Sequence, residues 1–287
     1  MVSGAFEPGA MEMMERIFAL FGVVALVALL APLSTHAAET EKIAASGEQS
    51  RSLGPSVTFN YGSSGDMIDS GTLIFTGTQT FKAITLNSPA TITTTAVSLD
   101  DIFMETRFGV EFNRRFTDHI GVHAGVFLKD LNGKTFNGFG VSAATQIEFV
   151  GSGFLTAAGA DTIHVKMDDA TEWGIYGGVK VHPLVFEKYS LYLRGDVGLL
   201  SSDEINARFS LVGNPGDLIK VEFFEREIQF FGNGGAGVEI RVGNFDLQGE
   251  IRAEWRDKRA VADGVQDIVG SNPIVTYPVS FSLMWRF

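Results

Sequence analysis

Tyr277-Pro-Val-Ser-Phe-Ser-Leu-Met-Trp-Arg-Phe287, the last stretch of the sequence, decides the fold class. Its odd-numbered positions are all apolar or aromatic, whereas its even-numbered positions are mostly small or polar. Side chains of a β-strand alternate between two faces, so this pattern predicts a strand with one apolar face. Such a face ending in Trp285 and Phe287 would be a liability in water but an anchor in lipid. The pattern therefore favours a strand that faces a bilayer.

The same alternation recurs in seven segments upstream. Their alternating faces lie at Val57–Tyr61, Met104–Phe112, Ile120–Leu128, Trp173–Val181, Tyr189–Leu199, Ala236–Val242 and Phe245–Trp255. Short connections, at 114–119, 184–188 and 243–244, alternate with connections of tens of residues. Short turns at one end and long loops at the other are typical of outer-membrane barrels.

We therefore predict an all-β protein, an antiparallel up-and-down transmembrane β-barrel of eight strands with periplasmic termini. Residues 71–98 also have the composition of strands. They either continue the barrel wall above the membrane as a protruding sheet or add two spans, which would make ten strands. A soluble lipocalin-like barrel would invert the polarity, with apolar residues inside and polar ones outside. This alternative is disfavoured because the aromatic residues fall at the two ends of the predicted strands, as in the aromatic girdles of a membrane barrel.

The N-terminal region predicts export. An apolar run from Ile17 to Ala31 follows Arg16 and precedes a stretch of small residues, which is the layout of a cleaved signal peptide at 1–37. The run is shorter than the roughly 20 residues that a spanning helix needs. Residues 38–52 would form a periplasmic tail and residues 53–287 the barrel. The predicted extracellular loops are residues 62–102, 130–171, 201–228 and 257–273.

The polar faces of the predicted strands carry equal numbers of acidic and basic residues. An eight-stranded barrel is just wide enough for its side chains to fill it, so this balance predicts a network of ion pairs that plugs the lumen. The predicted network contains Glu105, Arg107, Glu111, Lys129, Lys180, Arg194, Asp196, Glu239, Arg241, Glu250, Arg252, Glu254, Arg256 and Arg286, together with Glu172 and Asp246. A gated narrow channel is the alternative.

The predicted loops carry the negative charge of the protein. The first three each have a net charge of −3 and the last has −1. We expect a solvated outer surface that does not bind nucleic acid, since such binding needs basic patches. An extracellular cationic partner or bridging divalent ions would suit this surface.

Three local motifs do not predict a chemical site. Gly232-Asn-Gly-Gly-Ala-Gly237 has dinucleotide-type spacing but precedes no helix. Asp168, Asp169 and Glu172 lack the full ligand set of a calcium loop. His164 and the serines at 201–202 show no spacing that indicates a catalytic triad. We predict no catalytic residue, no cofactor and no metal site.

The terminal strand and the alternation resemble the small Gram-negative outer-membrane β-barrel superfamily, with OmpA- and OmpX-like transmembrane domains. The resemblance implies that Tyr277, Phe281, Leu283, Trp285 and Phe287 form the assembly signal read by the barrel insertion machinery. It also implies contact with outer-membrane lipid and lipopolysaccharide. The expected function is a non-enzymatic surface, structural or adhesion-type protein of the outer membrane. A narrow porin-like channel for small or apolar solutes is the alternative, and a lipid-modifying barrel enzyme is a weaker one.

Overall fold

The structure is a computed structural model that describes residues 55–64, 73–75, 84–87, 90–94, 97–149, 152–262 and 274–286. The predicted signal peptide, the periplasmic tail and Phe287 lie outside the described residues. Within these ranges, no helix has the length and apolar character needed to cross a membrane. The helix described, α3, is the four-residue segment Leu99–Ile102.

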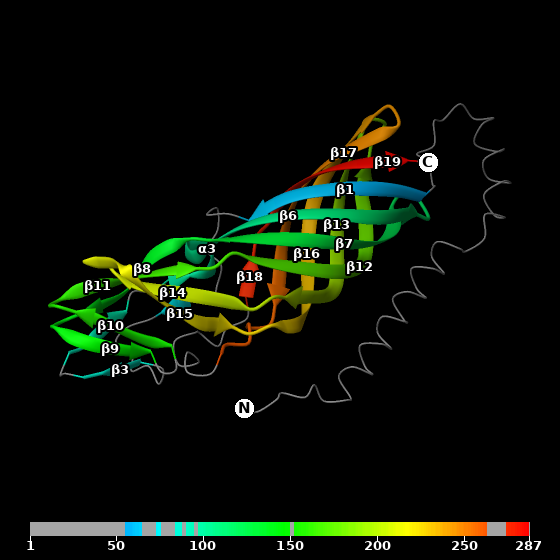
Figure 1. Cartoon of the computed structure of the whole chain (residues 1–287). Coiled ribbons are helices and arrows are strands. Elements are labelled where there is room, and N and C mark those ends of the chain that lie inside the picture. The colour runs from blue at the N-terminus through cyan, green and yellow to red at the C-terminus, as the bar shows by residue number, and fades with distance from the viewer. Residues whose placement is uncertain are drawn as a thin grey trace, which may run out of the picture.

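Eight antiparallel strands form a closed barrel (Figure 1). They are β1 (Pro55–Ser64), β6 (Phe103–Arg115), β7 (Ile120–Gly133), β12 (Ala170–Val185), β13 (Tyr189–Ser202), β16 (Glu227–Val242), β17 (Phe245–Arg256) and β19 (Val279–Arg286). The ladder runs β16-β13-β12-β7-β6-β1-β19-β17, and pairing of β16 with β17 closes it. The prediction of eight strands rather than ten is confirmed.

The two faces of the barrel wall differ in polarity as the alternation predicts. In β17, Leu247 and Ile251 are exposed on the outside, whereas Glu250 and Arg252 are buried inside. Aromatic side chains lie on the outer face near both ends of the wall. Phe245 and Trp285 stack with ring centroids 6.4 Å apart at the end where the short turns lie. An apolar exterior around a polar interior is the arrangement that a membrane barrel requires.

The predicted terminal strand is interrupted. Residues 274–276 form β18 (Ile274–Thr276), and Tyr277 and Pro278 separate it from β19. Both pieces pair with β17 in one register, since Glu254 is opposite Thr276 and Ile251 is opposite Val279. The interruption therefore leaves the register unchanged. It affects only the hydrogen bonding between the strands, because Pro278 has no N–H to donate.

The long connections fold into a lobe of three small sheets beyond one end of the barrel (Figure 1). One sheet contains β15 (Asn214–Phe224), β14 (Ile205–Leu211), β11 (Asp161–Met167), β8 (Thr135–Val141) and β4 (Ile92–Thr94). A second contains β10 (Gly153–Ala157), β9 (Thr145–Phe149) and β3 (Ile84–Leu86), and a third contains β2 (Leu73–Phe75) and β5 (Val97–Ser98). The protruding sheet, one of the two arrangements expected for residues 71–98, is the one observed.

The lobe has a hydrophobic core of its own. Ile163, Val165 and Met167 of β11 are completely buried in it, and the ring of Phe209 lies 4.7 Å from that of Phe149. Each such side chain contributes roughly 1.5–3 kcal/mol when it is buried. The lobe therefore has a buried apolar face in addition to the solvated outer surface that the sequence predicts.

The lobe core is continuous with the inside of the barrel. The same cluster includes Phe103, Leu131 and Ala170, which point inward at the top of the barrel strands. The inner face of the lobe sheets therefore continues the lumen, and their outer face continues the lipid-facing wall. Apolar packing closes the lumen at the end that adjoins the lobe.

Candidate functional site

Beneath the lobe core, a first layer of ion pairs crosses the lumen. Glu172 accepts hydrogen bonds from Arg256 at 2.9 Å and from the hydroxyl of Ser202 at 2.9 Å, and Arg259 lies 3.2 Å away. Glu254 pairs with Arg107 at 2.9 Å and also with Lys129. Each buried charge therefore has an opposite partner, which offsets the large cost of removing it from water.

A layer of aromatic rings lies deeper in the lumen. The guanidinium of Arg107 stacks 3.6 Å above the ring centroid of Phe127, and Phe127 meets Phe231 edge-to-face at 5.5 Å. Tyr176 and Leu200 complete this buried cluster. The charged layer above is joined to the aromatic layer by this cation–π contact.

Glycines make room for these rings on the neighbouring strands. Gly174 is directly opposite Phe127, and a Cβ added there would lie 2.3 Å from Cζ of the ring. The same arrangement recurs in three further register pairs, Gly125 with Tyr176, Gly198 with Phe231 and Gly237 with Tyr192. A glycine in a strand interior often marks close approach by another group, and here that group is an aromatic side chain inside the barrel.

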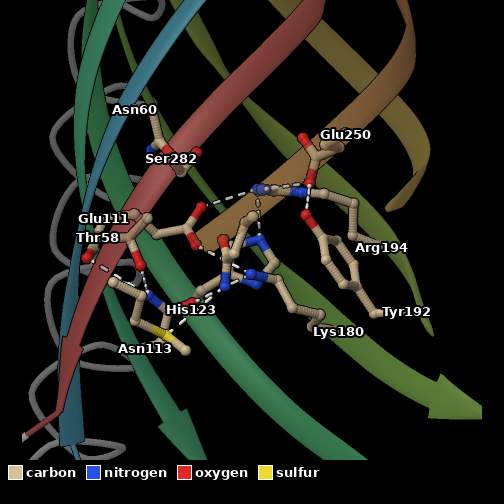
Figure 2. A network of polar contacts seen from close by, with 12 residues as sticks. Thr58, Asn60, Glu111, Asn113, His123, Lys180, Tyr192, Arg194, Glu250 and Ser282 are labelled. Carbon is tan, nitrogen blue, oxygen red and sulfur yellow. Dashed lines mark hydrogen bonds and ion pairs between the residues drawn. The ribbon is translucent and has the colours of Figure 1, made fainter. Parts of the chain in front are cut away.

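Arg194 is the centre of the next charged layer, which Figure 2 shows. Its guanidinium lies 2.9 Å from Glu111, 2.6 Å from Asp196 and 3.3 Å from Glu250. His123 contacts the same Asp196. One cation therefore holds three carboxylates from strands β6, β13 and β17.

Further donors complete this layer (Figure 2). Lys180 lies 3.4 Å from Glu111, and the hydroxyl of Tyr192 donates to Glu250 at 2.9 Å. Arg252 is a second cation on Glu250. The carboxylate oxygens are thus surrounded by donors, and the layer fills the middle of the barrel.

The lumen opens only slightly at the opposite end, where the short turns lie. Arg115 pairs with Glu239 at 2.7 Å, and Arg286 with Asp246 at 3.2 Å. These residues and Arg241 line a cavity with about 20 Å³ accessible to the centre of a water molecule. That volume holds about one water, so it is a shallow vestibule rather than the start of a pore.

The structure brings the predicted lumen residues together. All sixteen point inward, and all but Arg241 and Arg286 at the mouth are buried. Other lumen residues were not predicted, among them Arg115, Arg259 and the inward rings of Phe127, Tyr192 and Phe231. Strand parity could have found Arg115 and the rings, since each lies on an inward-facing position. No periodicity marks Arg259, which follows the end of β17.

The motifs that were set aside do not assemble into a site. Asp168 pairs with Arg208 at 2.7 Å, whereas Glu172 points into the lumen, so the acidic run does not converge. Across the described ranges, no group of three metal-ligating side chains comes together. Ser202 hydrogen-bonds to Glu172 in the lumen, and His164 lies on β11 of the lobe, so they form no triad.

No protein-family model matches the sequence, and no curated protein matches it. Solved structures of similar shape do exist. The attachment invasion locus protein Ail of Yersinia pestis, crystallised with the heparin analogue sucrose octasulfate, is 14% identical, with a TM-score of 0.34 over 81% of this chain and 99% of its own. Neisserial surface protein A is 9% identical, with a TM-score of 0.37 over 81% and 97%. The outer membrane protein OprG of Pseudomonas aeruginosa is 13% identical, with a TM-score of 0.39 over 83% and 99%.

The wall and the lumen together decide what this molecule is. Leu193 and Ile251 are exposed on the outer wall, while Arg194 and Arg252 are buried inside. Only a lipid environment makes an entire barrel exterior of this kind stable, and only closure of the sheet satisfies its backbone there. The chain is a closed eight-stranded antiparallel β-barrel with the apolar exterior and charged interior of a transmembrane protein.

Proposed function

We propose that this chain is a non-enzymatic surface protein of the Gram-negative outer membrane. Its lobe makes contacts outside the cell, while its barrel is a closed anchor. The observation that carries the proposal is the filling of the lumen. Two ion-pair layers, centred on Glu172 and Arg194, lie on either side of the aromatic layer around Phe127. Opening a path would require separating buried charges, which is energetically costly.

The construction of the lobe supports the same proposal. A solute channel needs no folded structure above its mouth, yet here the strands continue outward and build a second hydrophobic core. A rigid scaffold that presents surface residues is the usual setting of a binding function. The acidic charge of these connections favours a cationic partner or divalent ions.

We expect the purified protein to show no reproducible conductance steps in planar lipid bilayers, at either polarity. The physical reason is that the narrow lumen contains paired charges and rings instead of water. An open porin inserted in the same bilayer set-up is the positive control. Reproducible steps from a pure, heat-modifiable preparation would contradict the closed anchor and favour the narrow channel.

The contact function can be tested with a trimmed lobe. Ser202 and Glu227 are directly opposite each other, so replacing residues 203–226 with Asn-Gly joins β13 to β16 by a two-residue turn. Leu131 and Ala170 are also opposite, so deleting residues 134–168 leaves a three-residue loop. We expect this variant to keep its barrel but to lose adhesion of displaying cells to immobilised collagen, laminin and epithelial monolayers.

The control for the trimmed variant is heat-modifiable migration together with surface level. Equal surface level with undiminished adhesion to every tested surface would rule out the lobe as the contact element. Adhesion by neither the trimmed nor the full-length protein would count against the contact function itself.

A further inference from the structure

Three basic side chains lie side by side on the outer face of the five-stranded lobe sheet. Lys166 of β11 is directly opposite Arg208 of β14, and Arg208 is directly opposite Lys220 of β15. Neighbouring strands are about 4.8 Å apart, so three positive charges fall within roughly 10 Å. We call Lys166, Arg208 and Lys220 the basic row.

The basic row works against the stability of the sheet. Like charges directly opposite one another in a sheet repel. Within the described lobe, Asp168 is the acid that pairs with the row, at 2.7 Å from Arg208 and 3.7 Å from Lys220. A single carboxylate cannot neutralise three cations. Such a local conflict in a protein of net charge −12 points to a ligand rather than to folding.

The basic row points sideways, away from the lobe core. Val165 and Met167 on either side of Lys166 are completely buried, so Lys166 itself faces outward. The side chains of Arg208 and Lys220 are 44% and 58% exposed. Since the outer face of this sheet continues the lipid-facing wall, the row faces whatever surrounds the barrel just outside the membrane.

The height of the row excludes the acyl region of the bilayer. Ser201 is opposite Trp173, whose exposed ring marks the upper aromatic belt, and Arg208 lies seven residues further along. At about 3.3 Å per residue and a tilt of about 40°, the row is no more than about 18 Å above the belt. That is the level of the sugars attached to the lipids of the outer leaflet.

We propose that the basic row binds phosphate groups on the core sugars of the lipopolysaccharide molecules that surround the barrel. The outer leaflet of this membrane consists of lipopolysaccharide, whose phosphates are the anions within lateral reach. The planar guanidinium of Arg208 can grip a phosphate with two hydrogen bonds, and the two lysines supply point charges. The row thus fastens the lobe to its own membrane, independently of the contact function proposed above.

Acidic residues nearer the barrel offer a second way to bind phosphate, through bridging divalent cations. Burial and the neighbouring Glu204 and Glu225 raise the pKa of Glu222, which is on the same face of β15 as Lys220. Carboxylates bind phosphates only through divalent cations, whereas the basic row binds them directly. Removal of divalent cations therefore separates the two arrangements.

The test uses the full mature protein in detergent, with fluorescent short-core lipopolysaccharide as the probe and anisotropy as the readout. One variant carries Lys166→Gln, Arg208→Gln and Lys220→Gln. The matched control carries Lys188→Gln, Arg226→Gln and Lys258→Gln, which removes three exposed positive charges that are not aligned. A basic residue near an anionic membrane contributes about fivefold in affinity, so we expect binding about a hundredfold weaker for the row variant and within about threefold of wild type for the control.

Further arms define the ligand. Enzymatically dephosphorylated lipopolysaccharide should bind all three proteins equally weakly, and EDTA should leave wild-type binding intact. The row variant should be at least as heat-stable as wild type, because its substitutions remove repulsion. Arg208→Gln alone, with an expected loss of about fivefold, is the second variant if the triple variant folds poorly.

The proposal is overturned if the row variant binds phosphorylated lipopolysaccharide as tightly as the control. It is also overturned if EDTA abolishes binding, which would assign the contact to bridged carboxylates. Row-dependent binding of soluble heparin without row-dependent binding of lipopolysaccharide would assign the row to an external glycan.

Discussion

Replacing Arg194 by leucine should destabilise the barrel by about 3–5 kcal/mol, the loss typical when one partner of a buried ion pair is removed. Arg194 lies within 3.3 Å of Glu111, Asp196 and Glu250, so leucine leaves three buried carboxylates short of a cation. Reversible urea unfolding in lipid vesicles, followed by tryptophan fluorescence, measures the change. The loss should exceed that of any exposed ion pair.

Arg226→Leu is the matched control for this prediction. It makes the same chemical change in the pair with Asp203, whose side chains are 74% and 54% exposed. Exposed ion pairs contribute about 0–1 kcal/mol, so little change is expected. If the two variants lost the same stability, the paired-lumen interpretation would be wrong.

Replacing Leu193 by arginine should cost about 2–4 kcal/mol, the value for a basic residue on the lipid face near the midplane. Leu193 is 54% exposed on β13, next to the buried Arg194. Leu218→Arg is the control, since Leu218 is 59% exposed on lobe strand β15, above the membrane. The two sites differ chiefly in whether lipid or water surrounds them.

Cysteine labelling gives an independent readout of the same assignment, because the chain contains no cysteine. A single cysteine at 193 should react with a lipid-soluble maleimide, and one at 194 should not. The assignment would be reversed if Leu193→Arg were as harmless as Leu218→Arg and the cysteine at 194, but not that at 193, reacted with the lipid-soluble maleimide.

Strand parity made the wall and the lumen predictable. If either strand were shifted by one residue, Arg194 or Arg252 would point into hydrocarbon. The alternation therefore fixes which side chains face the lumen and which face lipid. The pairing of individual charges was not predictable in this way. Arg194 of β13 meets Glu111 of β6 across the lumen, and that contact depends on closure and stagger of the whole barrel.

The lobe core was harder to foresee than the barrel. Its strands are short, and their periodicity is interrupted between elements. Met167 and Ala170 both face inward although they are three residues apart, because Asp168 and Asp169 break the alternation. Arg259 reaches the lumen from a segment without regular structure, so no sequence periodicity predicted its inward position.

The glycines opposite the lumen rings also constrain how this sequence can diverge. The ring of Phe127 occupies the space that a side chain at Gly174 would fill, and the ring of Tyr192 does the same at Gly237. A larger residue at the glycine overfills that space, and a smaller residue at the ring empties it; each change alone costs on the order of 1–5 kcal/mol. Across related sequences, the two positions of each pair should therefore vary jointly, with a ring gained on one strand where it is lost from the next. Substitutions inside the barrel should therefore occur in coupled pairs, whereas those at lipid-facing positions should occur independently of one another.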